Sequence, residues 1–168
     1  MMNSRLAGRI AVLVWTLAAA TACADTGNAP MAADWASRIR PAHPRMFFTA
    51  ESFAQVKAYV LQHEREYYER RIKNAVAALP LEPDADACER GKNKLYGPYA
   101  QMSAFVWLME GDAEALAKAR NYLVAGVDYY NRRSSARQTV NWYSASRVGA
   151  MTAYDWIYDQ LTPADRKR

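Results

Sequence analysis

The stretch NWYSASRVGAMTAYDWIYDQLTPADRKR, residues 141–168, decides the fold class. Small residues recur there every four positions: Ala145, Gly149 and Ala153. This spacing, with aromatic residues gathered at the far end, predicts a helix over about residues 142–161. A second helix is expected to begin directly afterwards, because Thr162 is a good N-cap and Pro163 suits the first helical position. No apolar face follows this start signal, so we expect the sequence to be the front part of a longer protein.

The segment that precedes residue 80 predicts a long helical arm. Residues 46–48 supply a short apolar anchor, after which Thr49 is expected to cap the first helix. Apolar residues then recur at helical spacing with a break near residues 62–63, and a loop is expected over residues 81–94. Two pairs of opposite charges, four residues apart, are expected to bridge on the exposed side: Glu66 with Arg70 and Glu69 with Lys73.

The middle of the chain predicts a helical hairpin. An almost wholly apolar inner helix over residues 98–110 should end at Gly111, and Asp112 should cap an amphipathic outer helix. Its expected apolar stripe, opposite Glu114 and Lys118, comprises Ala115, Leu116, Ala119, Leu123, Val127 and Tyr130. A polar link over residues 131–139 should lead to the next inner helix.

Strand signals are nearly absent, so the predicted fold class is all-α. Trp107 and Trp156 occupy comparable places before the caps of two outer helices. Such a repeat of helical hairpins predicts stacked antiparallel hairpins, arranged as an open solenoid or a closed toroid. Two hairpins and an arm do not close a ring. The expected architecture over residues 40–168 is therefore an incomplete α/α toroid.

The N-terminal 22 residues differ from the rest of the chain. Arg5 and Arg9 precede an uncharged apolar run that is too short to span a bilayer but has the length of a signal-peptide core. Two outcomes stay open: cleavage after Ala22, or attachment of a lipid to Cys23 as the first residue of a bacterial lipoprotein. Residues 23–39 are expected to form a flexible tether. The predicted location is the periplasm or the outer membrane of a Gram-negative bacterium, with a lipid anchor as the only membrane attachment.

The charge and the cysteine content of the chain limit the function classes that are compatible with it. The chain has 168 residues, of which 51% are hydrophobic and 23% charged, as in an ordinary soluble protein. The formal net charge of +5 is spread through segments of mixed sign, which favours solvated helix faces over nucleic-acid binding. A basic groove for an acidic polysaccharide stays open. No structural disulfide is expected between Cys23 and Cys88, because it would tie a tether to a loop.

Few side chains suggest catalysis or metal binding. His43 precedes a proline at the entry to the first helix, where a structural role is favoured. His63 has Tyr67 at the position where a zinc-protease motif needs a second histidine, so no metal is expected there. Asp155 and Asp159 lie one helical turn apart and could form a pair of catalytic carboxylates, but bonding to a neighbouring joint or to an arginine is favoured.

Two segments of the ordered region resemble one protein family. HPRMFFTAESFAQVKA (residues 43–58) and AYDWIYDQLTPADR (residues 153–166) are similar to two segments of the toroid in heparinase II/III-like polysaccharide lyases and their oligoalginate-lyase relatives. The resemblance implies an α/α toroid followed in the full protein by a β-sandwich domain, which carries the family's zinc site. It therefore implies neither a metal nor a cofactor on the residues of this chain.

The resemblance also implies a reaction. Members of that family cleave uronic-acid-containing polysaccharides by β-elimination, in which a base removes the proton beside the carboxylate and an acid protonates the leaving oxygen. The family's catalytic histidine and tyrosine lie later than the matched segments, and neither His43 nor His63 aligns with a catalytic position. The catalytic residues are therefore unknown, and the chain alone is expected to be inactive.

Contact with an acidic polysaccharide or oligosaccharide is predicted at the start of the last inner helix, at Asn141, Trp142, Tyr143 and Arg147. In a toroid this end faces the groove, where an aromatic ring can stack on a sugar and an arginine can bind a uronate carboxylate. The alternative interpretation makes Trp142 a core residue and Arg147 a cap of a neighbouring helix. The equivalent place one hairpin earlier is held by Tyr96, Tyr99 and Gln101.

Two other function classes stay open. A toroid glycoside hydrolase would use two carboxylates and water, and its product would lack the ultraviolet absorbance of the unsaturated elimination product. A helical-repeat binding or scaffold lipoprotein would need no catalytic residue, and residues 24–168 would then melt cooperatively alone.

Overall fold

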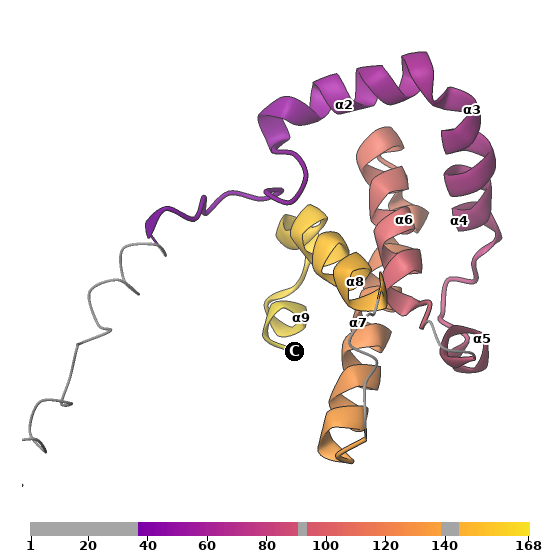
Figure 1. Ribbon diagram of the computed structural model, residues 1–168, viewed down its shortest axis with the longest axis vertical. Coiled ribbons are helices and arrows are strands. Elements are labelled where there is room, and N and C mark those ends of the chain that lie inside the picture. Colours follow the sequence, from indigo (N-terminus) through magenta and orange to yellow (C-terminus); the bar gives the residue numbers. More distant parts are fainter. Residues whose placement is uncertain (1–36, 91–93, 139–144) are drawn as a thin grey trace, which may run out of the picture. The chain divides into compact units, whose positions relative to one another are not determined.

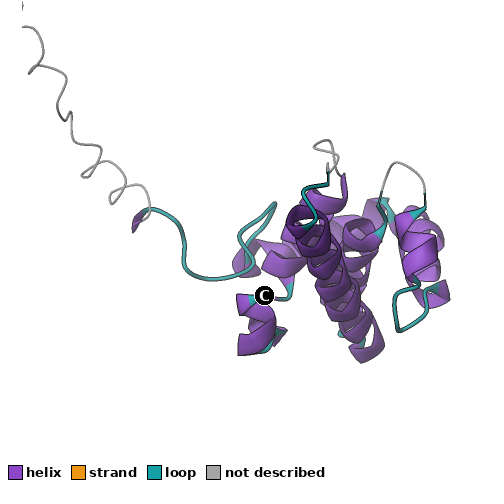
Figure 2. Cartoon of the chain, turned by 90° about the horizontal axis from the view of Figure 1, so that it is seen from below, coloured by secondary structure: helices purple, strands orange, loops and turns teal. Residues whose placement is uncertain are grey.

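The computed structural model describes residues 37–90, 94–138 and 145–168. The chain divides into two units, residues 1–40 and 41–168, and helices α2 to α9 all belong to the second. The described residues form helices and loops without any strand (Figure 2), which confirms the all-α fold class. Within this part of the chain, no helix combines the length and the apolar character needed to cross a bilayer. The predicted signal peptide, Cys23 and most of the predicted tether fall outside the described residues.

The predicted arm is present and is built from four successive helical segments (Figure 1): α2 (Ala50–His63), α3 (Arg65–Tyr67), the π-helix η1 (Tyr68–Lys73) and α4 (Asn74–Ala78). Thr49 caps α2 as expected, because its hydroxyl accepts from the Ser52 amide while the Ser52 hydroxyl accepts from the Thr49 amide. The break lies at Glu64, where φ is −125° and ψ is 16°. The predicted break in the arm is therefore present, next to the expected residues 62–63.

Two details of the arm differ from the prediction. Within the expected anchor of residues 46–48, Phe48 is buried, whereas Phe47 has a φ of 69° and is 76% exposed. Lys73 pairs with Glu110 of the next helix at 2.8 Å, so the predicted pair of Lys73 with Glu69 was wrong. A π-helix has more residues per turn, and residues four apart no longer face each other there. The other predicted pair does form, with 2.7 Å between Glu66 Oε1 and Arg70 Nη1.

A one-turn helix interrupts the segment predicted as a loop over residues 81–94. This helix, α5 (Ala85–Glu89), begins where the Asp84 carboxylate accepts a hydrogen bond from the Ala87 amide at 3.2 Å. Cys88 on α5 is 1% exposed and belongs to the main core. The burial of Cys88 explains why a segment without apolar periodicity is nevertheless ordered against the helices.

The predicted hairpin joins α6 (Tyr96–Glu110) to α7 (Ala113–Ser135). Gly111 takes the left-handed conformation with a φ of 72°, which glycine adopts without steric cost. The Asp112 carboxylate accepts from the amides of Glu114 and Ala115 and so caps α7. Both local predictions for this joint are confirmed.

Two predictions for α7 were wrong: the position of its C-terminal end and the exposure of Lys118. The helix continues to Ser135, through most of the expected link over residues 131–139, because Tyr129 is buried and Arg132 suits the negative end of the helix dipole. Lys118, expected on the exposed side, is 3% exposed. Its ammonium donates to the Val76 carbonyl at 3.0 Å and so satisfies the end of α4, which offsets the burial of its charge.

The last inner helix, α8 (Ala145–Trp156), ends earlier than predicted, because the expected end was at residue 161. A 3-10 helix, η2 (Tyr158–Gln160), and an extended Leu161 follow it. The predicted start of α9 (Pro163–Lys167) is confirmed, because the Thr162 hydroxyl accepts from the Asp165 amide at 3.1 Å. Both Ile157 and Leu161, which follow the end of α8, are buried.

α6 packs against both α7 and α8, and its contact with α8 depends on two glycines. The Gly97 amide donates to the Ser146 hydroxyl at 3.2 Å. A Cβ atom added at Gly149 would lie 2.6 Å from the Gly97 carbonyl carbon, so the two backbones nearly touch. The predicted stripe of small residues therefore serves close helix packing, with Gly149 and Ala153 buried in it.

Cys88 provides a direct test of this core. Burial raises the pKa of its thiol to about 11, so little thiolate forms at neutral pH. In the Cys23→Ser variant, we expect an aromatic disulfide reagent at pH 8 to label folded protein at least about a hundredfold more slowly than denatured protein. Equal labelling rates before and after denaturation would show that Cys88 is not in the core.

Candidate functional site

Arg147 is the one member of the predicted contact set that the structure describes, since Asn141, Trp142 and Tyr143 fall outside the described residues. It lies in the first turn of α8, half-buried, and its guanidinium carbon is 5.9 Å from the ring centroid of Tyr130 on α7. This contact brings the start of α8 to the C-terminal end of α7. There the structure gathers further cations and aromatic rings, among them Lys94 of the predicted loop, Tyr130 of the predicted stripe, and Arg133 of the predicted link.

We call this group the cation–aromatic site; its members are Glu89, Lys94, Tyr129, Tyr130, Arg132, Arg133 and Arg147. The rings of Tyr129 and Tyr130 have centroids 5.1 Å apart and are nearly perpendicular, at 75°. The Lys94 ammonium lies 5.9 Å from the centroid of the Tyr129 ring, and the Arg133 guanidinium carbon lies 6.0 Å from it. Three cations thus lie against two adjacent aromatic rings, within the range of cation–π attraction.

An open cavity of about 280 Å³ forms part of this site. Its lining residues are Glu89, Tyr129, Arg132, Arg133, Ala136 and Gln138. This volume is near the lower end of the range for small-molecule sites. The cavity can therefore hold a small unit of a ligand and leaves the remainder of a longer ligand on the surface.

Glu89 is the one acidic residue in the group. Its Oε1 atom accepts from the Tyr96 hydroxyl at 3.0 Å and from Arg132 Nη2 at 3.2 Å. Tyr96 is 2% exposed, which corrects its predicted place on a groove. Burial, and then the hydrogen bond to Glu89, raise the pKa of Tyr96, so this hydroxyl stays a donor over the physiological pH range. The carboxylate is thereby held in one position by a neutral donor and a charged one.

Positive charge exceeds negative charge around the cavity. The described members of the site include four cations, Lys94, Arg132, Arg133 and Arg147, and one acid, Glu89, whose carboxylate accepts from Arg132. Such an excess favours an anionic ligand. A planar guanidinium suits a carboxylate, and a tyrosine ring suits the apolar face of a sugar.

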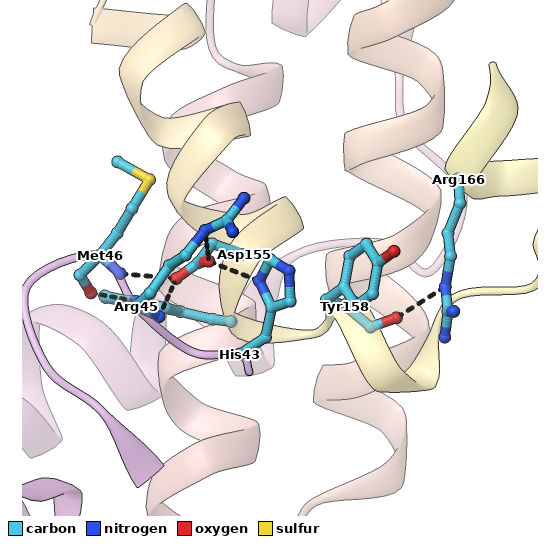
Figure 3. Close-up of polar contacts among 7 residues, drawn as sticks. His43, Arg45, Met46, Asp155, Tyr158 and Arg166 are labelled. Atoms are coloured by element: carbon cyan, nitrogen blue, oxygen red, sulfur yellow. Dashed lines mark hydrogen bonds and ion pairs between the residues drawn. The ribbon is translucent and has the colours of Figure 1, made fainter. Parts of the chain in front are cut away.

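A second arrangement joins residues 43–46 to α8 (Figure 3). Asp155 on α8 is 3% exposed, and its Oδ1 atom lies 2.6 Å from His43 Nδ1. Its Oδ2 atom accepts from the backbone amides of Arg45 and Met46, each at 2.7 Å. We call these contacts the Asp155 lock, because one carboxylate holds three donors of a segment more than a hundred residues earlier in the chain.

Aromatic contacts extend the Asp155 lock. The His43 ring stacks on Tyr158, with centroids 3.9 Å apart and planes at 17°, and the Arg166 guanidinium carbon is 4.3 Å from the centroid of the Tyr158 ring (Figure 3). Trp156 Nε1 donates to the Met46 carbonyl at 3.1 Å. These contacts confirm that His43 and Asp155 bond to neighbouring segments, as the sequence favoured.

The other candidate residues from the sequence, Asp159 and His63, belong to neither arrangement. Asp159 is exposed on η2, whereas Asp155 is buried in the lock. The His63 ring is 4.8 Å from that of Tyr59 on the outside of the arm. Within the described ranges, no three His, Cys, Asp or Glu side chains come together in a way that could hold a metal ion.

Comparisons of the chain with protein-family models, with curated proteins and with solved structures find no match. Function is therefore inferred from the geometry of the two arrangements above. The Asp155 lock is partly buried, and its carboxylate accepts hydrogen bonds from within the chain, although His43, Arg45, Met46 and Asp155 also line a cavity of about 390 Å³. The cation–aromatic site lines an open cavity of about 280 Å³ and, among its described members, has more cations than acids.

Proposed function

We propose that this chain is the carbohydrate-binding part of an exported polysaccharide lyase, and that the cation–aromatic site binds uronic-acid units of an acidic polysaccharide. The observation that carries the proposal is the placement of three cations against two adjacent tyrosine rings beside an open cavity. A uronate unit combines an apolar ring face with one carboxylate. Both features have partners of matching chemistry in this site.

Each part of the site has a distinct role in this proposal. Arg147 and Arg133 bind the carboxylate, and Tyr130 offers the half-exposed ring on which a sugar stacks. The cavity beside Arg132 and Gln138 accommodates one unit of the polymer. Because the site is open, the neighbouring units of the chain extend over the surface.

Two features of the sequence support the wider part of the proposal. The segments 43–58 and 153–166 resemble toroid lyases, and these are the segments that the Asp155 lock joins. The charge and apolar pattern of residues 1–22 supports export, with or without a lipid on Cys23. The elimination chemistry of such lyases is assigned to no residue of this chain, and the toroid arrangement of its hairpins is part of the proposal.

Loss of the Arg147 guanidinium tests the proposal. We expect Arg147→Ala to weaken binding of a uronate oligosaccharide about tenfold or more, because a charge-assisted hydrogen bond to the carboxylate is lost. The melting temperature should stay nearly unchanged, since Arg147 is half-exposed. Isothermal calorimetry and thermal unfolding on the same samples give both values.

Arg71→Ala is the matched control for this measurement. Arg71 is exposed on η1 of the arm, so its loss removes the same charge from a surface outside the cation–aromatic site. Affinity in this variant should fall by less than about twofold. A large loss of stability in Arg147→Ala with normal affinity would assign Arg147 to helix packing and end the proposal.

A further inference from the structure

We infer that Glu89 is a charge-density filter in the cation–aromatic site: it admits polymers with one carboxylate per sugar and disfavours polysulfated ones. This inference rests on the proposed function and names its substrate class. Its basis is a carboxylate within a group of cations that would otherwise attract any polyanion. Removal of such a charge should change which anions bind, and how tightly.

Glu89 is held as a fixed charge. Its carboxylate accepts hydrogen bonds from Tyr96 and Arg132, and its backbone carbonyl accepts another from Lys94 Nζ. Its side chain is 33% exposed and lines the cavity, so the charge faces the space that a ligand would enter. Tyr96 lies in the core and cannot follow if the carboxylate swings outward. The Glu89 carboxylate therefore stays in its position when an anionic ligand enters the cavity.

Ligands of different charge density meet this arrangement differently. A uronate unit can place its one carboxylate at Arg147 and Arg133 and leave the Glu89–Arg132 pair intact. A unit with additional sulfates must place a second anion close to Glu89 or compete with Glu89 for Arg132. Like charges a few ångströms apart repel, and partial burial reduces screening by salt. This repulsion therefore lowers the affinity of the more densely charged ligand only.

Glu89→Gln separates this role from a structural one. The amide oxygen of glutamine can still accept from the Tyr96 hydroxyl, so the fold should be retained while the charge is lost. Asp86→Asn is the matched control, because it removes the same charge from an exposed position on the same short helix, outside the cavity lining. Both variants raise the net charge of the chain equally.

The experiment measures the Kd of the full chain for an alginate oligosaccharide and for a heparin oligosaccharide of equal length, at one ionic strength. We expect the wild type to prefer alginate. Glu89→Gln should bind heparin about fivefold more tightly, with a change below about twofold for alginate. Asp86→Asn should change neither affinity by more than about twofold.

The outcomes that would overturn the inference differ from those that would overturn the proposed function. Equal changes for both oligosaccharides in Glu89→Gln, or a wild-type preference for heparin, would end the role of Glu89 as a filter, while Arg147-dependent binding of alginate would keep the function. If the wild type binds neither oligosaccharide, the proposed function fails as well.

Discussion

Replacing Gly97 by alanine is expected to destabilise the fold by about 3 kcal/mol or more, enough to remove a large share of the stability of a domain of this size. The added Cβ atom would lie 1.7 Å from the Ser146 carbonyl oxygen and 2.8 Å from the Ala150 amide nitrogen. These are backbone atoms of α8, which cannot turn aside as a side chain can. α6 and α8 would have to separate, and chemical denaturation followed by circular dichroism should show a much lower midpoint.

Two other glycines make this test specific. Gly126→Ala should destabilise much less than Gly97→Ala, because its Cβ atom would meet only the Tyr96 Cβ, in a tight contact of 3.0 Å, and the improved helical propensity offsets part of that cost. Gly111→Ala should cost about 1–2 kcal/mol for the left-handed backbone, although no atom lies within 4 Å of the added carbon. If Gly97→Ala destabilises no more than Gly111→Ala, the close contact between α6 and α8 is not present in solution.

The second large effect is expected for Asp155→Ala, which should cost about 3–5 kcal/mol. The substitution leaves the Arg45 and Met46 amides and the His43 ring without their acceptor in a partly buried place. The segment before α2 should then detach from α8. Thermal unfolding would show the loss of stability, and limited proteolysis should cleave first after Arg45.

Asp159→Ala serves as the control for this prediction. Asp159 is an exposed carboxylate on the adjacent turn, and its loss should change the free energy of unfolding by less than about 0.5 kcal/mol. Asp155→Asn should fall between the two, because the amide keeps one oxygen acceptor and turns an NH2 group toward donors. Equal stability of all three variants would mean that the Asp155 lock does not hold the N-terminal segment.

The parts of the fold that the sequence predicted well depend on local chemistry. Thr49, Asp112 and Thr162 cap helices through a hydroxyl or carboxylate that reaches amides two or three residues further on, so each signal lies within a few residues. Gly111 likewise ends α6 through its own backbone freedom. Such signals need no knowledge of the tertiary structure.

The wrong predictions concern residues whose partners are distant in sequence. Lys118 belongs to an exposed stripe by periodicity alone, yet it is buried because the carbonyls at the end of α4 need a donor. Lys73 turns to Glu110 because η1 is a π-helix, and no spacing rule indicated this local widening. The end of α8 at Trp156 likewise depends on contacts of the following turn with the segment before α2.

The candidate site was predicted only in part, at Arg147. The run DYYNRR at residues 128–133 contains adjacent aromatic residues and adjacent arginines, a composition that could have indicated the site. It was divided between an apolar stripe and a polar link, because the end of α7 was placed too early. Glu89 could not be assigned, since its contact with Arg132 joins residues 43 positions apart.

The two arrangements divide the chain by role. The Asp155 lock joins residues 43–46 to α8, and its members contact one another, so these residues maintain the fold. The cation–aromatic site lies outside the Asp155 lock, although one of its members, Arg147, lies in the first turn of α8, the helix that carries Asp155.

The most direct test of the central claim is a titration of isotopically labelled chain with an alginate oligosaccharide, followed by NMR chemical shifts. The account predicts that the largest shift changes fall on Tyr129, Tyr130 and the side chains of Arg132, Arg133 and Arg147, and that they diminish as salt is raised. Changes confined to the arm around His63 and Tyr67, or no saturable change at all, would contradict it.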